Sequence, residues 1–231
     1  MVRFLAGTAL AILFTVAAPI ELLASSISGK ILILKDVGRA ATVAVTYDLR
    51  GAPVSDVARK NSNNFDRVAI WLESETPEPT VAAPAPIIAT MQQRNRQLEP
   101  ELLVLPQGST VNFPNLDPIF HNIFSLSKAQ SFDLGYYPKG SSRSVTFPRT
   151  GIVQVYCHVH PNMSGAIVIT SSRWSGKPGP DGAFLWNGVP PGKYRLMIWQ
   201  RFAGLFRRDV VVPASGEVAV QAAIPEQREE R

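Results

Sequence analysis

Residues 153–163 read Val-Gln-Val-Tyr-Cys-His-Val-His-Pro-Asn-Met and contain Cys157, the only cysteine of the chain, together with two of its three histidines. The alternation before the cysteine predicts an extended strand. On such a strand Cys157 shares a face with Val153 and Val155, whereas His158 points to the opposite face. His158 is therefore expected to be a surface residue or one that lies outside the ligand set, while Cys157 points into the core.

The residues after Cys157 supply further metal-ligand side chains at short spacing. Two residues separate Cys157 from His160, so both can turn toward one centre, and two more bring Met163 near the same place. His121 lies upstream, where a neighbouring strand can deliver it. Two imidazoles, a thiolate and a weak axial thioether form the donor set that electron-transfer copper uses. We therefore predict one mononuclear type 1 copper site with His121, Cys157, His160 and Met163 as metal ligands.

Zinc is the main alternative metal for cysteine and histidine ligands. Structural zinc sites usually close with four strong ligands. This chain offers three such ligands and a methionine. An exported protein with a single cysteine also needs an explanation for its unpaired thiol, and ligation to a metal provides one. The donor set therefore favours copper.

The spacing Cys157-x-x-His160-x-x-Met163 resembles the ligand loop of cupredoxins of the amicyanin and pseudoazurin type. Residues 120–123, Phe-His-Asn-Ile, resemble the segment around the first histidine ligand of that family. The resemblance covers roughly residues 91–170 and implies a Greek-key β-sandwich. It also implies that Asn122 ties the two ligand-bearing loops together by hydrogen bonding, and that His160 is the ligand nearest the surface.

The histidine count bears on catalysis. Multicopper oxidases and nitrite reductases need further histidines and carry a histidine directly before the cysteine, where this chain has Tyr156. A binuclear copper centre would need a second cysteine. We therefore expect no enzyme, but a carrier of single electrons between redox partners. The alternatives are copper storage, sensing or delivery, and a recognition protein whose sandwich binds carbohydrate or peptide.

Outside the copper segment the sequence is also β-rich. Short β-branched segments separated by proline and glycine turns predict an all-β chain. Expected strands lie at 27–34, 41–47, 68–72, 102–105, 110–113, 122–126, 144–147, 152–157, 166–170, 192–199, 210–212 and 218–222. The chain has four tryptophans, Trp71, Trp174, Trp186 and Trp199. We expect them in the core of a second sandwich.

The flanking segments resemble carboxypeptidase regulatory-like (transthyretin-like) β-sandwiches. Residues 27–31 and 68–72 match the early strands of such modules, and residues 181–184 and 190–194 match the late ones. This implies that the copper domain is inserted between two halves of a smaller sandwich. The expected division is 27–78 and 171–225 for the two halves, 88–170 for the cupredoxin domain, and 226–231 for a charged tail.

The N-terminus predicts export. Arg3 precedes the largely apolar residues 4–20, and small residues at 24–26 offer a cleavage site, so residues 1–26 are predicted to be a signal peptide. An uncleaved anchor is the alternative, because Leu22 and Leu23 make a poor cleavage site. After cleavage no stable membrane insertion is expected, and the expected location is the bacterial periplasm.

The charge balance is modestly basic, with a net charge of +5 and a pI of about 9.6. A basic surface favours an acidic protein partner or an anionic surface, and solubility alone is the alternative explanation. The partner we expect is a redox protein with an acidic docking face. Lysine and arginine do not alternate with aromatic residues, so nucleic acid is not expected as a partner.

Overall fold

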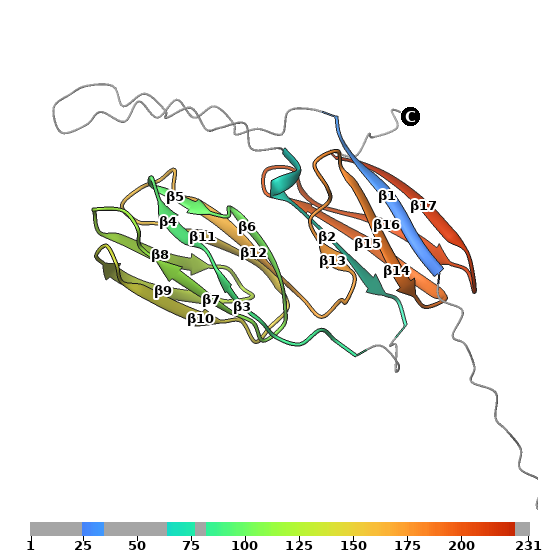
Figure 1. Cartoon of the computed structure of the whole chain (residues 1–231), viewed down its shortest axis with the longest axis horizontal. Helices are drawn as coiled ribbons and strands as arrows, with labels where there is room; N and C mark the ends of the chain where they lie inside the picture. The colour runs from blue at the N-terminus through green and yellow to red at the C-terminus, as the bar shows by residue number, and fades with distance from the viewer. Residues whose placement is uncertain (1–24, 35–63, 77–81, 225–231) are drawn as a thin grey trace, which may run out of the picture.

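The computed structural model describes residues 25–34, 64–76 and 82–224 (Figure 1). These residues form β-strands and one short 3-10 helix, η1 (Asn64–Arg67), so the prediction of an all-β chain is confirmed. Within the described ranges no helix has the length and apolar character to cross a membrane. The predicted strand 41–47, the tail 226–231 and most of the predicted signal peptide lie outside these ranges.

Residues 88–170 form the central half of the molecule, which consists of two main sheets and a hairpin. The larger sheet has the order β6 (Leu102–Pro106), β12 (Ser164–Thr170), β11 (Gly151–Tyr156), β8 (His121–Leu126) and β9 (Ser131–Tyr137). The smaller sheet has the order β10 (Ser142–Thr146), β7 (Thr110–Pro114) and β3 (Ile88–Thr90). The hairpin pairs β4 (Gln92–Arg94) with β5 (Gln97–Glu99). The strands β3 and β9 and this hairpin have no counterpart among the predicted strands.

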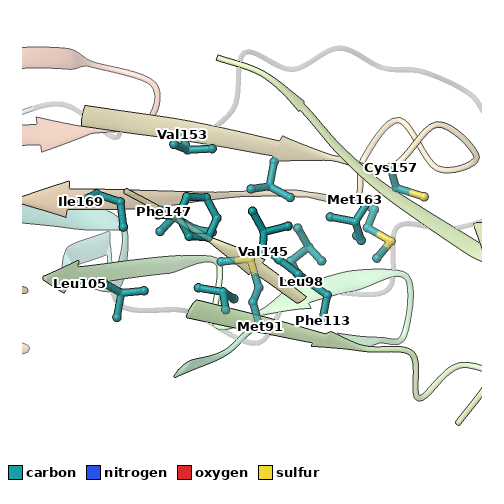
Figure 2. Close-up of a cluster of buried hydrophobic side chains, with 14 of the residues drawn as sticks. Met91, Leu98, Leu105, Phe113, Val145, Phe147, Val153, Cys157, Met163 and Ile169 are labelled. Atoms are coloured by element: carbon teal, nitrogen blue, oxygen red, sulfur yellow. The ribbon is translucent and has the colours of Figure 1, made fainter. Parts of the chain in front are cut away.

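The core of the central half lies between its sheets. Alternate residues of facing strands, among them Phe113 of β7 and Val153 of β11, are buried against one another because successive side chains of a strand point to opposite faces. Figure 2 shows this core, with Leu105 and Ile169 at one end and Cys157 and Met163 at the other. Two of the predicted ligands, Cys157 and Met163, therefore lie at one end of a packed apolar core.

The remaining strands form the outer sandwich. One sheet has the order β14 (Ala183–Val189), β1 (Ser25–Ile33) and β17 (Glu217–Ile224). The other has the order β13 (Ser175–Gly176), β2 (Val68–Ser74), β15 (Gly192–Gln200) and β16 (Gly204–Val212). Strands from before and after the central half thus pair with each other. Such pairing is required if residues 88–170 are inserted between two halves of one sandwich. The division into domains itself stays a prediction.

The first described strand overlaps the predicted signal peptide. β1 begins at Ser25, and the buried Ser25 hydroxyl donates a hydrogen bond to the carbonyl of Pro213 (2.8 Å). Its neighbour Ser26 pairs in parallel with Glu217. Ser25 and Ser26, which the sequence prediction assigned to the signal peptide, are therefore part of the outer sheet.

An apolar layer joins the outer sandwich to the central half. In this seam, Trp71, Met197 and Trp199 of β2 and β15 pack with Leu102, Ala166 and Val168 of β6 and β12. A polar contact lies beside it, where Arg67 Nε is 2.6 Å from Glu101 Oε2. Trp174 and Trp186 contribute to the outer core as expected, but Trp71 and Trp199 lie in the seam. Sequence alone did not separate the two roles, because both demand buried aromatic residues.

Candidate metal centre

Cys157 directly follows the last residue of β11, and its side chain is buried at the end of the central core. Val153 and Val155 lie in the same apolar cluster, as the alternation predicted. The loop that follows is closed by two backbone hydrogen bonds: Cys157 N donates to Met163 O (3.1 Å) and Met163 N donates to His160 O (2.9 Å). These bonds hold residues 157–163 in a compact turn.

Three of the four predicted ligands converge. His121 is the first residue of β8 and is fully buried. The Cys157 sulfur, Sγ, lies 3.8 Å from His121 Nδ1 and 3.9 Å from His160 Nδ1. The ligand atoms of these residues all lie within 4.8 Å of one another. The short loop and the β8 strand thus bring together side chains that are far apart in the sequence.

These distances fit a metal ion. A metal ion bonded to sulfur at about 2.3 Å and to nitrogen at about 2.0 Å, with a sulfur–metal–nitrogen angle of about 120°, places the sulfur and the nitrogen about 3.7 Å apart. The separations of 3.8 and 3.9 Å are close to that value. A thiolate and two imidazoles could therefore share one ion without a change of backbone.

Met163, the fourth predicted ligand, is fully buried in the same apolar cluster as Cys157. Figure 2 shows the two sulfur-containing side chains next to each other at one end of the core, whereas Met91 lies farther along it. This position allows a thioether to serve as a weak ligand, and it equally fills the end of the core.

The surroundings of the thiol favour its charged form. Burial raises the pKa of Cys157, but hydrogen bonding to His121 and to the backbone N–H groups of Asn122, His160 and Val159 outweighs it, so the pKa lies below its usual value. The thiolate is the form that binds metals. The predicted link between the two ligand loops is thus made by the Asn122 backbone. The Asn122 side chain instead donates to Asp133 Oδ1 (2.6 Å).

The two imidazoles have different surroundings. Burial lowers the pKa of His160, and the nearby charges of His121 and Arg96 lower it further, which favours the neutral ring that ligates metals. For His121, burial also acts to lower the pKa, but its contacts with Cys157 and Asp117 prevail, so the pKa is raised. His160 is partly exposed and His121 is not, as the resemblance implied.

His158 lies on the opposite face of the strand end, as predicted. Its ring stacks on Phe124 with a centroid separation of 3.8 Å and an interplanar angle of 4°. Its Nε2 is 3.6 Å from Asp133 Oδ2, and the side chain is 45% exposed. His158 therefore takes no part in the ligand cluster.

The sequence did not single out Asp117, which contacts His121 directly. Its Oδ2 lies 2.8 Å from His121 Nε2, and the carboxylate is buried. Burial raises the pKa of Asp117, but hydrogen bonds from the Arg96 and Asn95 backbones and from His121 bring it below its usual value. An aspartate in a loop before a histidine is common, and only the fold shows that the two side chains meet.

Exposed apolar side chains lie next to the ligands in sequence and in the sheet. Phe120 precedes His121, Val159 precedes His160, and Tyr136 pairs with Asn122 across β8 and β9. Phe120 and Tyr136 are each 59% exposed. We call Phe120, Val159 and the exposed Ile119 the apolar rim of the site.

Comparisons with known proteins give structural likenesses only. No family model and no curated protein matches the chain. A purple cupredoxin from Nitrosopumilus maritimus is 26% identical and covers 36% of this chain and 99% of its own, with a TM-score of 0.34. A reduced Cu(I) form of an amicyanin mutant is 24% identical and covers 44% of this chain and 98% of its own, with a TM-score of 0.33.

A copper-containing nitrite reductase from Thermus scotoductus is 23% identical, and the match covers 42% of this chain and 25% of that one, with a TM-score of 0.34. All three TM-scores lie below 0.5, and we draw no inference about the function of this chain from them.

Proposed function

We propose that this protein holds one mononuclear type 1 copper ion on His121, Cys157, His160 and Met163 and carries single electrons between redox partners outside the cytoplasm. The observation that carries this proposal is the pair of Sγ–Nδ1 separations, 3.8 and 3.9 Å, in a buried cluster of a thiol and two imidazoles. This spacing is set by β8, β11 and the closed loop 157–163.

Bound copper would supply a one-electron couple between Cu(II) and Cu(I). The residues of the chain hold the site still while the charge changes: His121 is packed in a rigid strand, and hydrogen bonds of the backbone fix the loop that carries Cys157 and His160. A site that keeps its shape needs little reorganisation, which favours rapid transfer. The chain has only three histidines, and His158 lies outside the cluster, so no histidines remain for a second, catalytic copper.

The apolar rim supports docking of a redox partner near His160. Phe120 and Val159 directly precede His121 and His160 in the sequence and are exposed, and exposed apolar side chains near a site are typical of interaction surfaces. Arg96 lies close enough to His160 to lower its pKa, so the rim has a cationic neighbour. A partner with an apolar docking face and acidic residues around it fits this surface. Salt would then slow association by screening the charges.

Export is part of the proposal, and its support is the apolar N-terminal segment together with a single buried thiol. The mature N-terminus should lie at or before Ser25, because this residue belongs to β1. Mass spectrometry of the protein recovered from a bacterial periplasm would test this. A protein found only in the cytoplasm with its first residues intact would contradict it.

The central test uses residues 25–231, which retain every described strand. Copper(II) is added to the metal-free protein, and visible absorption and cyclic voltammetry are recorded. We expect an intense thiolate-to-copper band, a stoichiometry of one, and a reversible one-electron couple. Copper that binds weakly and exchanges freely, without such a couple, would favour storage or delivery. A folded, copper-loaded protein that lacks the band would overturn the type 1 assignment.

Two variants make this test specific. Cys157→Ser removes the thiolate and should abolish the band. His158→Gln changes the adjacent histidine, whose ring stacks on Phe124 away from the cluster, and should leave the band in place. Loss of the band in both variants would show that folding, not ligation, had been disturbed.

A further inference from the structure

The carboxylate of Asp117 joins a ligand histidine to a distant backbone turn. It lies in the loop between β7 and β8 and is 6% exposed. Its Oδ1 accepts a hydrogen bond from Asn95 N (2.6 Å), and its Oδ2 accepts one from Arg96 N (2.8 Å). The same Oδ2 is 2.8 Å from His121 Nε2. A buried carboxylate thus faces three nitrogen atoms.

The hydrogen bonds define which nitrogen of His121 carries the proton. Backbone N–H groups only donate, so both oxygens of Asp117 act as acceptors. The short contact with Nε2 then requires that Nε2 carry a hydrogen. In its neutral form His121 has one N–H, which this contact places on Nε2, so Nδ1 keeps its lone pair. The charged ring, which the contacts with Cys157 and Asp117 favour, also carries a proton on Nδ1 and must lose it before that atom binds a metal. Nδ1 is the atom that faces the Cys157 sulfur at 3.8 Å.

The turn at the other end of the carboxylate has an unfavourable backbone conformation. Asn95 and Arg96 have φ values of 53° and 56°, in the left-handed region that costs most residues other than glycine free energy. Both of their N–H groups are bound by Asp117. The carboxylate therefore stabilises the β4–β5 turn as well as the histidine.

Asp117 is itself fixed by hydrogen bonds of the loop between β7 and β8. Its N–H donates to Asn115 Oδ1 (3.0 Å), and Asn115 Nδ2 donates to the carbonyls of Ile119 (2.8 Å) and Tyr137 (3.0 Å). These bonds fix the loop that leads from β7 into β8. The position of the carboxylate is thus set by the scaffold and not by a metal ion.

We propose that Asp117 is a positioning residue that presets the metal-binding tautomer of His121 in the metal-free protein. This inference rests on the proposed ligand role of His121. It differs from a purely structural role, in which Asp117 would only stabilise the β4–β5 turn. A carboxylate that orients a ligand histidine typically changes metal affinity about 10–100-fold when it is removed.

The variant Asp117→Asn separates the two roles. Its amide has one acceptor oxygen and an NH₂ group that only donates. With the oxygen at the Oδ1 position, where it accepts from Asn95 N, the NH₂ group faces His121 Nε2 and favours the tautomer with hydrogen on Nδ1, which cannot bind a metal through that atom. We expect the affinity for copper(II) and for zinc(II) to fall about 10–100-fold, measured against a competing chelator. The matched control is Asp133→Asn, at the carboxylate that binds Asn122 and lies near His158, and its affinity should stay within about twofold.

The tautomer itself can be read without any variant. In the full, metal-free chain at alkaline pH, nitrogen-15 chemical shifts of the His121 ring identify the protonated nitrogen. We expect Nε2–H in the wild type and a shift toward Nδ1–H in Asp117→Asn. Nδ1–H in the wild type would overturn the proposal outright, whatever the variants do. Wild-type affinity in a folded Asp117→Asn protein would also overturn it.

A second variant tests whether a loss of affinity in Asp117→Asn comes from a disturbed β4–β5 turn. Replacing Asn95 by glycine in the Asp117→Asn protein lowers the cost of positive φ in the turn and keeps Arg96, whose charge acts on His160, in place. This double variant should fold and still bind metal weakly. Full recovery of affinity would mean that Asp117 serves only the turn. The zinc affinity and the nitrogen-15 shifts do not depend on a copper absorption band. A wild-type protein that shows the expected tautomer and binds zinc, but forms no type 1 copper site, would contradict the proposed function and not this inference.

Discussion

The two halves of the molecule are both β-sandwiches, but they bury different kinds of side chain. The outer core is formed by apolar side chains such as Ile31, Leu196 and Tyr194. The buried polar side chains of the central half, among the described residues, are Gln93, Ser109, Asn115, Asp117, His121, Asn122, Ser125 and Thr170. In the outer sandwich the corresponding residues are Ser25 and Gln200, which bind nearby backbone at a strand start and a hairpin turn.

Burying a polar group costs free energy unless its hydrogen bonds are satisfied. The outer sandwich avoids this cost almost entirely. The central half accepts it in the loop before β8, where Asn115 and Asp117 hold His121. The buried polar residues next to His121 therefore accompany the candidate site and not the fold class, whereas Ser109 and Thr170 lie at strand ends on the opposite side of the core. Of two sandwiches with similar architecture, the outer one therefore serves mainly to stabilise the fold, and the central one carries the candidate metal site.

The largest expected effect comes from the outer core. Leu196→Ala removes a fully buried side chain of β15, and such cavities destabilise by about 3 kcal/mol. All four tryptophans lie outside residues 88–170, so urea unfolding followed by tryptophan fluorescence reports mainly on the outer sandwich and the seam. We expect the fluorescence transition to have its midpoint at a lower urea concentration. At urea concentrations below this transition, the copper absorption should be unchanged.

A matched change in the central half tests whether the halves are independent. Ile167→Ala, also at a fully buried position, should lower the transition seen by copper absorption at least as much as that seen by fluorescence. If Leu196→Ala removed copper from protein that is still folded, the comparison between a stabilising half and a functional half would fail.

Much of this contrast was predictable from sequence, because strands and ligand spacing are local patterns. β8, β11 and β12 fall close to the predicted ranges, and Cys157 points to the face that the alternation predicted. β3, β9 and the β4–β5 hairpin were missed. β3 has only three residues, the hairpin and β9 lack a run of β-branched residues, and β9 carries Asp133 and Gly135 in its interior.

The parts of the site that were missed depend on contacts distant in sequence. Asp117 meets Asn95 and Arg96 only because the β4–β5 turn folds over the loop before β8. Likewise, no local pattern distinguishes Trp71, which packs in the seam, from Trp174, which packs in the outer core. Local periodicity states that a side chain is buried, but not against which partner.

A moderate effect is expected for the polar network behind the site. The Tyr137 hydroxyl donates to the carbonyl of Phe113 (2.9 Å) and accepts a hydrogen bond from Gln93 Nε2. Tyr137→Phe leaves these buried groups with fewer partners and should destabilise the central half by about 1–2 kcal/mol. Chemical unfolding of the copper-loaded protein measures this. An unchanged midpoint would show that the network does not contribute to stability.

A smaller effect is expected where the outer sandwich approaches the site. Arg201, in the turn after β15, lies 5.8 Å from the ring centroid of Tyr156, the residue before Cys157. Burial lowers the pKa of Arg201, while Tyr156 and Glu101 act to raise it. Arg201→Met keeps most of the volume and removes the cation–π contact, so a loss of about 0.5–1 kcal/mol is expected. Chemical unfolding measures it, and a gain in stability would mean that the cost of burying the guanidinium exceeds the attraction.

The smallest expected effect lies on the exposed surface of the outer sandwich. Arg195 on β15 is 3.0 Å from Glu75 and 3.5 Å from Asp209, and the three side chains are 40%, 36% and 82% exposed. Ion pairs of this kind contribute about 0–1 kcal/mol and are screened by salt. Arg195→Gln should therefore shift the urea midpoint little, and less still at high salt. A double-mutant cycle with Glu75→Gln isolates the pair. A coupling above about 2 kcal/mol would place a strong polar interaction in the half that we describe as apolar, and would remove the basis for assigning buried polar chemistry to the site alone.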